Sequence, residues 1–348
     1  MEVDWSDLPE DMLFSIAMRM DHLSDYVRFG AVCKSWRSAI SGNPQPPLHL
    51  RFPFLLLSDN ITEDHALYSP LERKLHPISL HDGLHPTRFL GSSSDGWVCM
   101  IDDNLYLLNP FSGAVDFLPP PRTSFDFVFK AVWSAEKTNP NCIIALLCEI
   151  YDRNTVYYCR PGDARWTALS TSLEFVNDVV FFNENLYVVD WKAERVVAMD
   201  LHQGTTTMMA VEALDGFLDW MDHYLHLAAG PSGPLLVVRH MKENVFETER
   251  FELFELDGTL KKWVETKSLD EGMLFLGWNS SIWLSSSSGL KECKGNSIYF
   301  IDENKDLGIF YLEGGSFGSI WGLDERPLYY NFELVVPILP WKEDGITF

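Results

Sequence analysis

The sequence predicts an α+β multidomain fold, with a small helical domain at residues 1–42, a linker at 43–51 and a larger all-β domain at 52–348. Three observations lead to this division. Apolar residues before residue 41 recur at helical spacing, whereas short runs rich in aromatic and β-branched residues recur after residue 52. Between the two parts lies "SGNPQPP" (41–47), where glycine and proline interrupt both helix and strand.

Composition excludes several classes of partner. The chain has 348 residues, of which 46% are hydrophobic and 22% charged, as is typical of a folded soluble protein. With 27 Lys and Arg against 50 Asp and Glu, the formal charge of −23 repels nucleic-acid phosphates and anionic lipid headgroups. The first ten residues lack the features of a secretory signal, and "FPFLLL" (52–57) is too short to cross a bilayer. We therefore expect a protein of the cytoplasm or nucleus with no nucleic-acid or membrane partner.

The first helix is predicted to begin near Pro9, because Pro suits a first turn and the acidic residues Asp7, Glu10 and Asp11 suit the positive end of a helix. One face of this helix is apolar, with residues at i, i+3, i+4 and i+7: Leu13, Ile16, Ala17 and Met20. Phe14 and Met18 widen the apolar arc beyond what one contact surface of a small bundle needs. The excess must be covered by the rest of the chain or by another protein.

A second helical run is predicted after "DHLSD" (21–25), with Ser24 as its N-cap. An apolar arc lies on this run and contains Phe29, Val32, Cys33, Trp36 and Ile40. Cys33 lies on the arc, so we interpret it as a packed residue rather than a nucleophile or a metal ligand. The six cysteines include no C-x-x-C pair, so reduced, mostly buried thiols are expected.

The N-terminal segment "SDLPEDMLFSIAMRMDHLSDYVRFGAVCKSWRSAI" resembles an F-box, the short helical module of substrate receptors in cullin-based ubiquitin ligases. The resemblance rests on "LP" at the start of a helix, "LSD" at the break and "VCKSW" in the last helix, and it covers about 40 residues. It implies a three-helix unit that binds a Skp-type adaptor and, through it, a cullin. By this analogy the adaptor contacts are Leu8, Pro9, Leu13, Ile16, Val32, Cys33 and Trp36, with Trp5 as an additional anchor. A helical cap that packs only on its own C-terminal domain is the alternative.

The large domain contains six hairpin-like units, each an aromatic and apolar strand, a polar turn and a second strand. They begin at Leu67, Leu105, Val156, Leu186, Phe251 and Ile298. Their starts lie about 46 residues apart on average, which is the scale of a four-stranded propeller blade. A ring removes the exposed edges that an open sheet must protect. The sequence therefore predicts a β-propeller of about six blades, with a pair of β-sandwiches as the alternative.

Several stretches of this domain, in order, resemble the C-terminal propeller-like domain of the kink-suppressed (KIB) type in plant F-box proteins. They include "FLGSSSDGWVCMID", "LYLLNPFSGAVDFLPP", "NDVVFFNENLYVVD", "LLVVRH" and "FLGWNSS". Together with the F-box, the resemblance covers most of the chain.

Motifs for catalysis or cofactor binding are weak. "GSIWG" (318–322) has isoleucine where a hydrolase nucleophile would stand, and no phosphate-binding G-x-x-x-x-G-K-[ST] occurs. His81 and His85 lie in a predicted loop, and His223 and His226 are expected on opposite sides of a strand, so neither pair suits a metal. Asp102 with Asp103 and Asp302 with Glu303 suit turns. We expect no catalytic residue, no metal and no cofactor.

The residues and the resemblance together predict a non-catalytic substrate-recognition subunit of a Skp, cullin and F-box ubiquitin ligase. The propeller would hold an unknown protein substrate on one face, through loops such as "NPFSG", "RPGDAR" and "DWKAER". Two alternatives remain open: an F-box protein that serves assembly without target turnover, and a propeller that binds a small ligand or glycan. A polar loop at 281–289 is a candidate for phosphorylation.

Overall fold

The computed structural model describes most of the chain. The described residues are 5–20, 22–41, 53–58, 65–70, 72–78, 84, 88–111, 113–120, 127–137, 139–150, 153–169, 173, 176–210, 223–242, 247–285, 294–301, 307–319 and 331–335. The predicted linker at 43–51, the pair His81 and His85, and the pair Asp302 and Glu303 lie outside these residues.

The N-terminal domain is helical, as predicted. A 3₁₀ turn precedes three α-helices: η1 (Trp5–Asp7), α1 (Glu10–Ala17), α2 (Leu23–Val32) and α3 (Lys34–Ser41). Pro9 is the N-cap of α1, and Glu10 and Asp11 lie in its first turn, where they match the positive end of the helix dipole. None of the helices in the described ranges is both long and apolar enough to cross a membrane.

Two details of the second helical run differ from the prediction. Helix α2 begins at Leu23 with His22 as its N-cap, so Ser24 lies inside the helix. The run is also divided, because Cys33 adopts an extended backbone with φ −161° and ψ 174°. The Cys33 carbonyl accepts the first hydrogen bond of α3, from the amide of Arg37 at 3.0 Å. The predicted arc is therefore divided between α2, which carries Phe29 and Val32, and α3, which carries Trp36 and Ile40. The Val32 side chain is 59% exposed.

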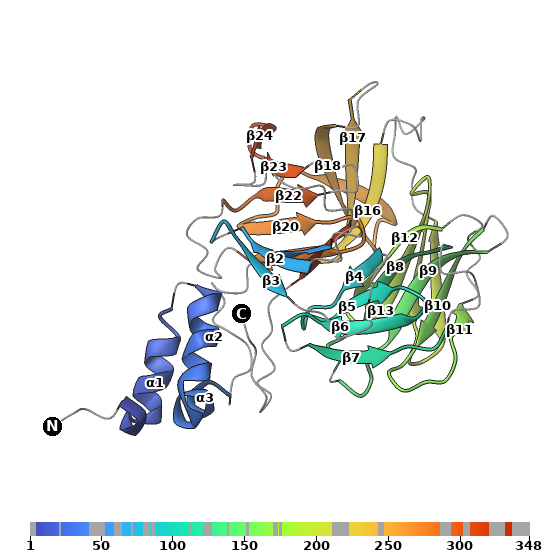
Figure 1. The fold of residues 1–348 in the computed structure, drawn as a ribbon. Coiled ribbons are helices and arrows are strands. Elements are labelled where there is room, and N and C mark those ends of the chain that lie inside the picture. The colour runs from blue at the N-terminus through green and yellow to red at the C-terminus, as the bar shows by residue number, and fades with distance from the viewer. Residues whose placement is uncertain are drawn as a thin grey trace.

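The rest of the described chain forms six sheets arranged as a ring (Figure 1). The first sheet has the order β25 (Asn331–Val335), β1 (Phe54–Ser58), β2 (His65–Ser69) and β3 (Lys74–Ile78). The second has β4 (Arg88–Ser92), β5 (Val98–Ile101), β6 (Leu105–Asn109) and β7 (Ala114–Phe117). The third has β8 (Val128–Trp133), β9 (Ile144–Ile150), β10 (Arg153–Cys159) and β11 (Thr167–Leu169).

The remaining three sheets complete the ring. The fourth has the order β12 (Val176–Phe182), β13 (Asn185–Asp190), β14 (Arg195–Asp200) and β15 (Thr205–Ala210). The fifth has β16 (His223–Ala229), β17 (Pro234–Met241), β18 (Thr248–Asp257) and β19 (Lys262–Thr266). The sixth has β21 (Ser281–Ser285), β20 (Gly272–Leu276), β22 (Ser297–Ile301), β23 (Leu307–Tyr311) and β24 (Ser316–Gly318), and β20 pairs with β22 in parallel.

The first strand of each sheet faces the centre of the ring. These inner strands contact one another in order, from β25 to β4, β8, β12, β16 and β21. The sheets are therefore the blades of a six-bladed propeller, which confirms the predicted fold class. At one contact, between β4 and β8, Gly91 has φ +145°, and a Cβ there would collide with the backbone oxygen of Ala131. Only glycine permits this approach.

Six apolar clusters fill the spaces between neighbouring blades. In β1, Leu55 and Leu57 belong to the cluster between blades six and one, while Phe54 and Leu56 belong to the cluster between blades one and two. Both faces of such strands are buried, so their sequences are continuous apolar runs without alternation.

The cluster between blades one and two also includes buried residues of the three helices, such as Leu13. The helices lie beside the ring, next to β2 and β3 (Figure 1).

The first blade is assembled from both ends of the domain. β25 pairs antiparallel with β1, with Leu334 opposite Leu55, and so closes the ring. Glu333 on β25 is buried and accepts hydrogen bonds from the Ser280 hydroxyl and the Leu334 amide. Burial raises the pKa of the Glu333 carboxyl from its ordinary 4.5 to about 7, although these hydrogen bonds and the charge of Lys130 act in the opposite direction.

This carboxyl predicts a pH dependence of stability. The Glu333 pKa is higher in the folded state, so the folded protein loses stability as pH rises from about 4.5 to about 7. Glu333→Gln keeps an acceptor for Ser280 without the buried charge. We expect it to raise the free energy of unfolding by on the order of 3 kcal/mol at pH 8 and by much less at pH 4.5. Urea unfolding at the two pH values measures this, with Glu313→Gln in the exposed β23–β24 turn as the control. An equal effect at both pH values would contradict it.

Candidate functional site

The helical domain keeps an apolar surface open. Five large apolar side chains of the described helical residues are exposed: Trp5, Met12, Phe14, Ile16 and Val32. Trp5 alone is 63% exposed. The predicted excess of apolar surface on the first helix is therefore present and is not covered by the described part of the chain. Such a surface is typical of a protein–protein contact site.

The residues assigned to adaptor binding divide between this surface and the core. Pro9, Ile16 and Val32 are exposed. Leu8, Cys33 and Trp36 are half-buried, with Leu8 and Trp36 packed against the cluster that includes the helices. Leu13 is only 1% exposed and holds the helices together from within, so its side chain does not reach a partner on this surface. The assignment of adaptor contacts remains a prediction.

Trp36 connects the last helix to the first turn of the chain. Its ring lies 4.5 Å from that of Phe29 between centroids, and its Nε1 donates a hydrogen bond to the Trp5 carbonyl at 3.0 Å. The indole therefore has a structural role in the helical domain. Met12 is an exposed apolar residue that the sequence analysis did not select. Its position directly before the buried Leu13 places it on a different side of α1, and this could have indicated its exposure.

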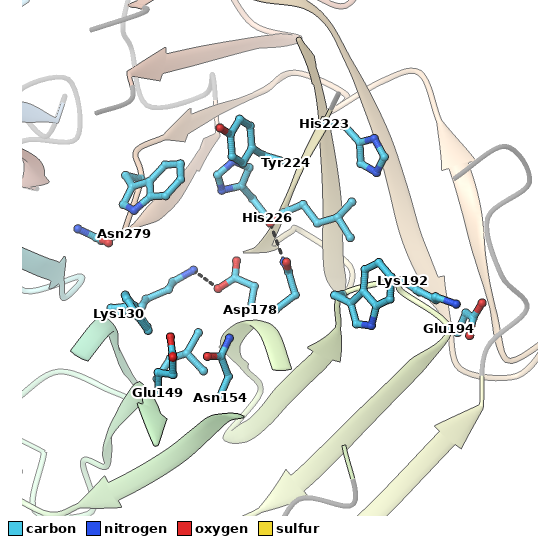
Figure 2. Close-up of a pocket in the computed structure, with 16 residues that line it drawn as sticks. Lys130, Glu149, Asn154, Asp178, Lys192, Glu194, His223, Tyr224, His226 and Asn279 are labelled. Atoms are coloured by element: carbon cyan, nitrogen blue, oxygen red, sulfur yellow. Dashed lines mark hydrogen bonds and ion pairs between the residues drawn. The ribbon is translucent and has the colours of Figure 1, made fainter. Parts of the chain in front are cut away.

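The propeller has a cavity of about 630 Å³ near its centre. It is lined by the first residues of β8, β12 and β16, the β13–β14 and β20–β21 turns, and residues at the β9–β10 end of blade three. This volume lies within the usual range for ligand pockets. Figure 2 shows Lys130, Asp178, His226 and Asn279 gathered on one side of the cavity, with Lys192 and Glu194 on the other.

The up-and-down direction of successive strands determines which predicted loops lie on the face that carries the cavity. "DWKAER" joins β13 to β14, the second and third strands of blade four, and its residues Trp191, Lys192 and Glu194 line the cavity. "NPFSG" and "RPGDAR" join third to fourth strands in blades two and three. In an antiparallel meander these turns lie at the opposite end of the strands. The prediction that the three loops share one face is wrong for this reason.

Buried polar bonds connect the inner strands beneath the cavity. The Lys130 ammonium on β8 forms an ion pair with the Asp178 carboxylate on β12 at 2.7 Å, and both side chains are buried. Asp178 also accepts the amides of Val179 and Leu227, each at 2.7 Å, which extends the connection to β16. A buried pair of this kind is costly to break, because removing one partner leaves an uncompensated charge.

The two histidines of β16 both border the cavity. His226 and Tyr224 lie on one side of the strand and His223 on the other, as the predicted strand requires (Figure 2). Burial lowers the pKa of His226 to about 4, so its imidazole is neutral near pH 7. The described residues contain no group of three or more His, Cys, Asp or Glu side chains suited to a metal ion.

The contacts around the described cysteines and the Asp102 carboxylate support packing or a turn. Burial is the main cause that raises the pKa of Cys142 to about 11 and that of Cys148 and Cys159 to about 12, so these thiols stay protonated. Cys33 is half-buried, and its sulfur lies 3.1 Å from the Ser35 hydroxyl. Asp102 accepts the amide of Asn104 at 2.6 Å in the turn after β5, which agrees with the predicted turn role.

Comparison with known families agrees with this architecture. Residues 5–45 match the F-box domain, and residues 67–311 match the KIB1-4 beta-propeller. A helical F-box joined to a six-bladed propeller defines the class of protein. The chain belongs to the KIB1-4 beta-propeller family of F-box proteins.

Relatives and solved structures can be compared over most of the chain. It is 25% identical to the F-box protein SKIP23 of Arabidopsis thaliana, over 97% of this chain and 95% of that protein. It is 22% identical to the F-box protein At2g17036 of the same plant, over 97% and 95%. The structure of TolB from Acinetobacter baumannii aligns with 89% of this chain and 72% of its own, with 9% identity and a TM-score of 0.46.

The contrast between the two tryptophans of the helical domain is testable. Trp36→Ala removes an indole packed on Phe29 and on the cluster, so we expect a loss of about 3 kcal/mol in the free energy of unfolding. Trp5→Ala removes an exposed ring but keeps the carbonyl that Trp36 uses, so the loss should stay within about 0.5 kcal/mol. Chemical unfolding followed by circular dichroism measures both. Equal losses would show that Trp36 has no special structural role.

Proposed function

We propose that the chain is the substrate-recognition subunit of a Skp, cullin and F-box ubiquitin ligase. F-box domains typically bind Skp-type adaptors, and this chain has an F-box at residues 5–45. The observation that supports the proposal most is the exposed apolar surface of the helices, which includes Ile16 and Val32 and which a partner must cover.

In this proposal the two domains have separate roles. The helices bind the adaptor, while the propeller binds the target protein at the face that carries the cavity. The chain forms no covalent bond itself. Its contribution is proximity, because fixing the target near a loaded ubiquitin carrier replaces a bimolecular encounter with a tethered one. The complex would act in the cytoplasm or nucleus.

The central experiment separates this function from its alternatives. The full chain should co-purify with an adaptor and a cullin, and the abundance of a captured target should rise when the chain is removed from cells. Complex assembly with no change in any target would favour an assembly role without turnover. A thermal shift with a metabolite or glycan, and no captured protein, would favour a ligand-binding propeller.

The adaptor surface can be tested at exposed positions, where folding is not at risk. Ile16→Asp and Val32→Asp place a charge on the apolar surface, so we expect each to weaken adaptor binding at least about tenfold. The negative charge in the last turn of a helix should lower the free energy of unfolding by no more than about 1 kcal/mol. Calorimetric titration with a Skp-type adaptor measures the affinity.

The matched control is Leu260→Asp, at a 60% exposed apolar residue in the turn after β18. It should leave adaptor affinity as in the native chain. Unchanged affinity in both helical variants would remove this surface from the adaptor interface.

A further inference from the structure

One buried ammonium group and three side-chain amides on the cavity wall donate to other parts of the protein. Lys130 is held by Asp178 at 2.7 Å. The amides of Asn154, Asn177 and Asn279 donate to backbone carbonyls at 2.6, 2.9 and 2.7 Å, respectively. The accepting carbonyls belong to Val176, Leu225 and Phe89. A carbonyl oxygen can only accept, so each NH₂ group must face its partner.

The side-chain oxygens of these asparagines remain as acceptors for a ligand. Each of the three asparagines has its Oδ1 left to offer, and no donor to these oxygens lies among the described residues. His226 is a second and independent indication that the cavity binds a polar ligand. It lines the cavity, it is only 8% exposed, and its Nε2 has no hydrogen-bond partner among the described residues. A neutral ring that carries its proton on Nδ1 presents one more acceptor at Nε2.

The charged residues of the lining favour a cation. The charged side chains that line the cavity are the carboxylates of Asp178, Glu149 and Glu194 and the ammonium groups of Lys130 and Lys192. Three carboxylates against two ammonium groups give the lining a formal charge of −1, in a protein of formal charge −23. An anionic ligand would find no buried cation without a partner here.

Aromatic rings complete the wall. Phe129, Trp191, Tyr224 and Trp278 line the cavity, and the Trp278 ring meets those of Tyr224 and His226 edge to face, with centroids 5.6 and 6.2 Å apart. The Lys192 ammonium already lies 5.1 Å from the centre of the Trp191 ring, so this ring accepts a cation. A guanidinium combines what these features require, because it is planar and cationic, has five donors and has no acceptor.

We propose that the cavity binds the guanidinium of an arginine side chain in a segment of the target protein, an inference that rests on the proposed receptor function for the identity of its ligand. The cavity volume of about 630 Å³ leaves room for residues that flank the arginine. The aromatic rings would stack on the guanidinium plane, and the carboxylates and amide oxygens would accept its N–H groups.

The test uses the full chain without its adaptor and three fluorescent peptides of one sequence, Gly-Ser-Xaa-Ser-Gly, with arginine, citrulline or glutamate at Xaa. Citrulline keeps the size of arginine and loses its charge. We expect the arginine peptide to bind at least about ten times more tightly than either of the others, by fluorescence anisotropy. Equal binding of arginine and citrulline, tighter binding of glutamate, or no saturable binding at millimolar peptide would each overturn the proposal.

Three variants assign the binding to the cavity. Glu194→Gln should weaken the arginine peptide several-fold, with Glu313→Gln as the control. Lys192→Ala removes the ammonium that competes for the Trp191 ring and should strengthen binding, whereas Lys267→Ala, which removes an exposed lysine elsewhere, should not. A gain of affinity is not an effect that loss of stability would produce, and its absence would contradict the stacking on Trp191.

The two proposals fail in distinguishable ways. Adaptor affinity is measured on the same samples by calorimetry. Loss of arginine selectivity with normal adaptor binding would refute only the cavity proposal. Failure of the native chain to bind an adaptor, with arginine selectivity intact, would refute only the ligase proposal.

Discussion

The pairing of β25 with β1 is the constraint on which the rest of the structure depends. Strand β25 comes from the C-terminal part of the chain and β1 from the start of the propeller, so this one antiparallel ladder closes a ring of six blades. Leu334 packs in the cluster between blades six and one, and Val335 packs in the cluster between blades one and two. The strand therefore completes two blade interfaces at once. Without it, β1 would be an open edge with both faces unsupported.

The hairpin units could be predicted because each is local in sequence. The units at Leu67, Leu105, Val156 and Phe251 are third and fourth strands of their blades, and the unit at Ile298 likewise occupies the third and fourth places of its sheet. The unit at Leu186 is the exception, because it pairs the second and third strands of blade four. This shift explains why its spacing to the unit before is short and to the unit after is long. Pattern alone does not reveal the position of a hairpin within its blade.

What could not be predicted depends on contacts between distant residues. The partner of β1 lies near residue 333, and no local period indicates it. The division of the second helical run at Cys33 was hidden because the apolar spacing continues across it. The cavity was missed for the same reason, since it joins Lys130, Asp178, His226 and Asn279 from four blades. Each of these residues is unremarkable in its own segment.

For the helices, the apolar excess was visible in the sequence, but only the structure separates the buried Leu13 from the exposed Ile16.

The bonds that hold the inner strands together also determine the chemistry of the cavity. Lys130 and the three asparagine amides link one strand to another, and in doing so they turn their donors toward the protein. Besides the Lys192 ammonium, a wall built in this way offers amide oxygens, carboxylates and aromatic faces. An anion could gain the buried Lys130 as a partner only by breaking the Lys130–Asp178 pair that joins blades three and four. A cationic ligand requires no such break. The proposed preference for a basic ligand thus follows from how blades three and four are joined.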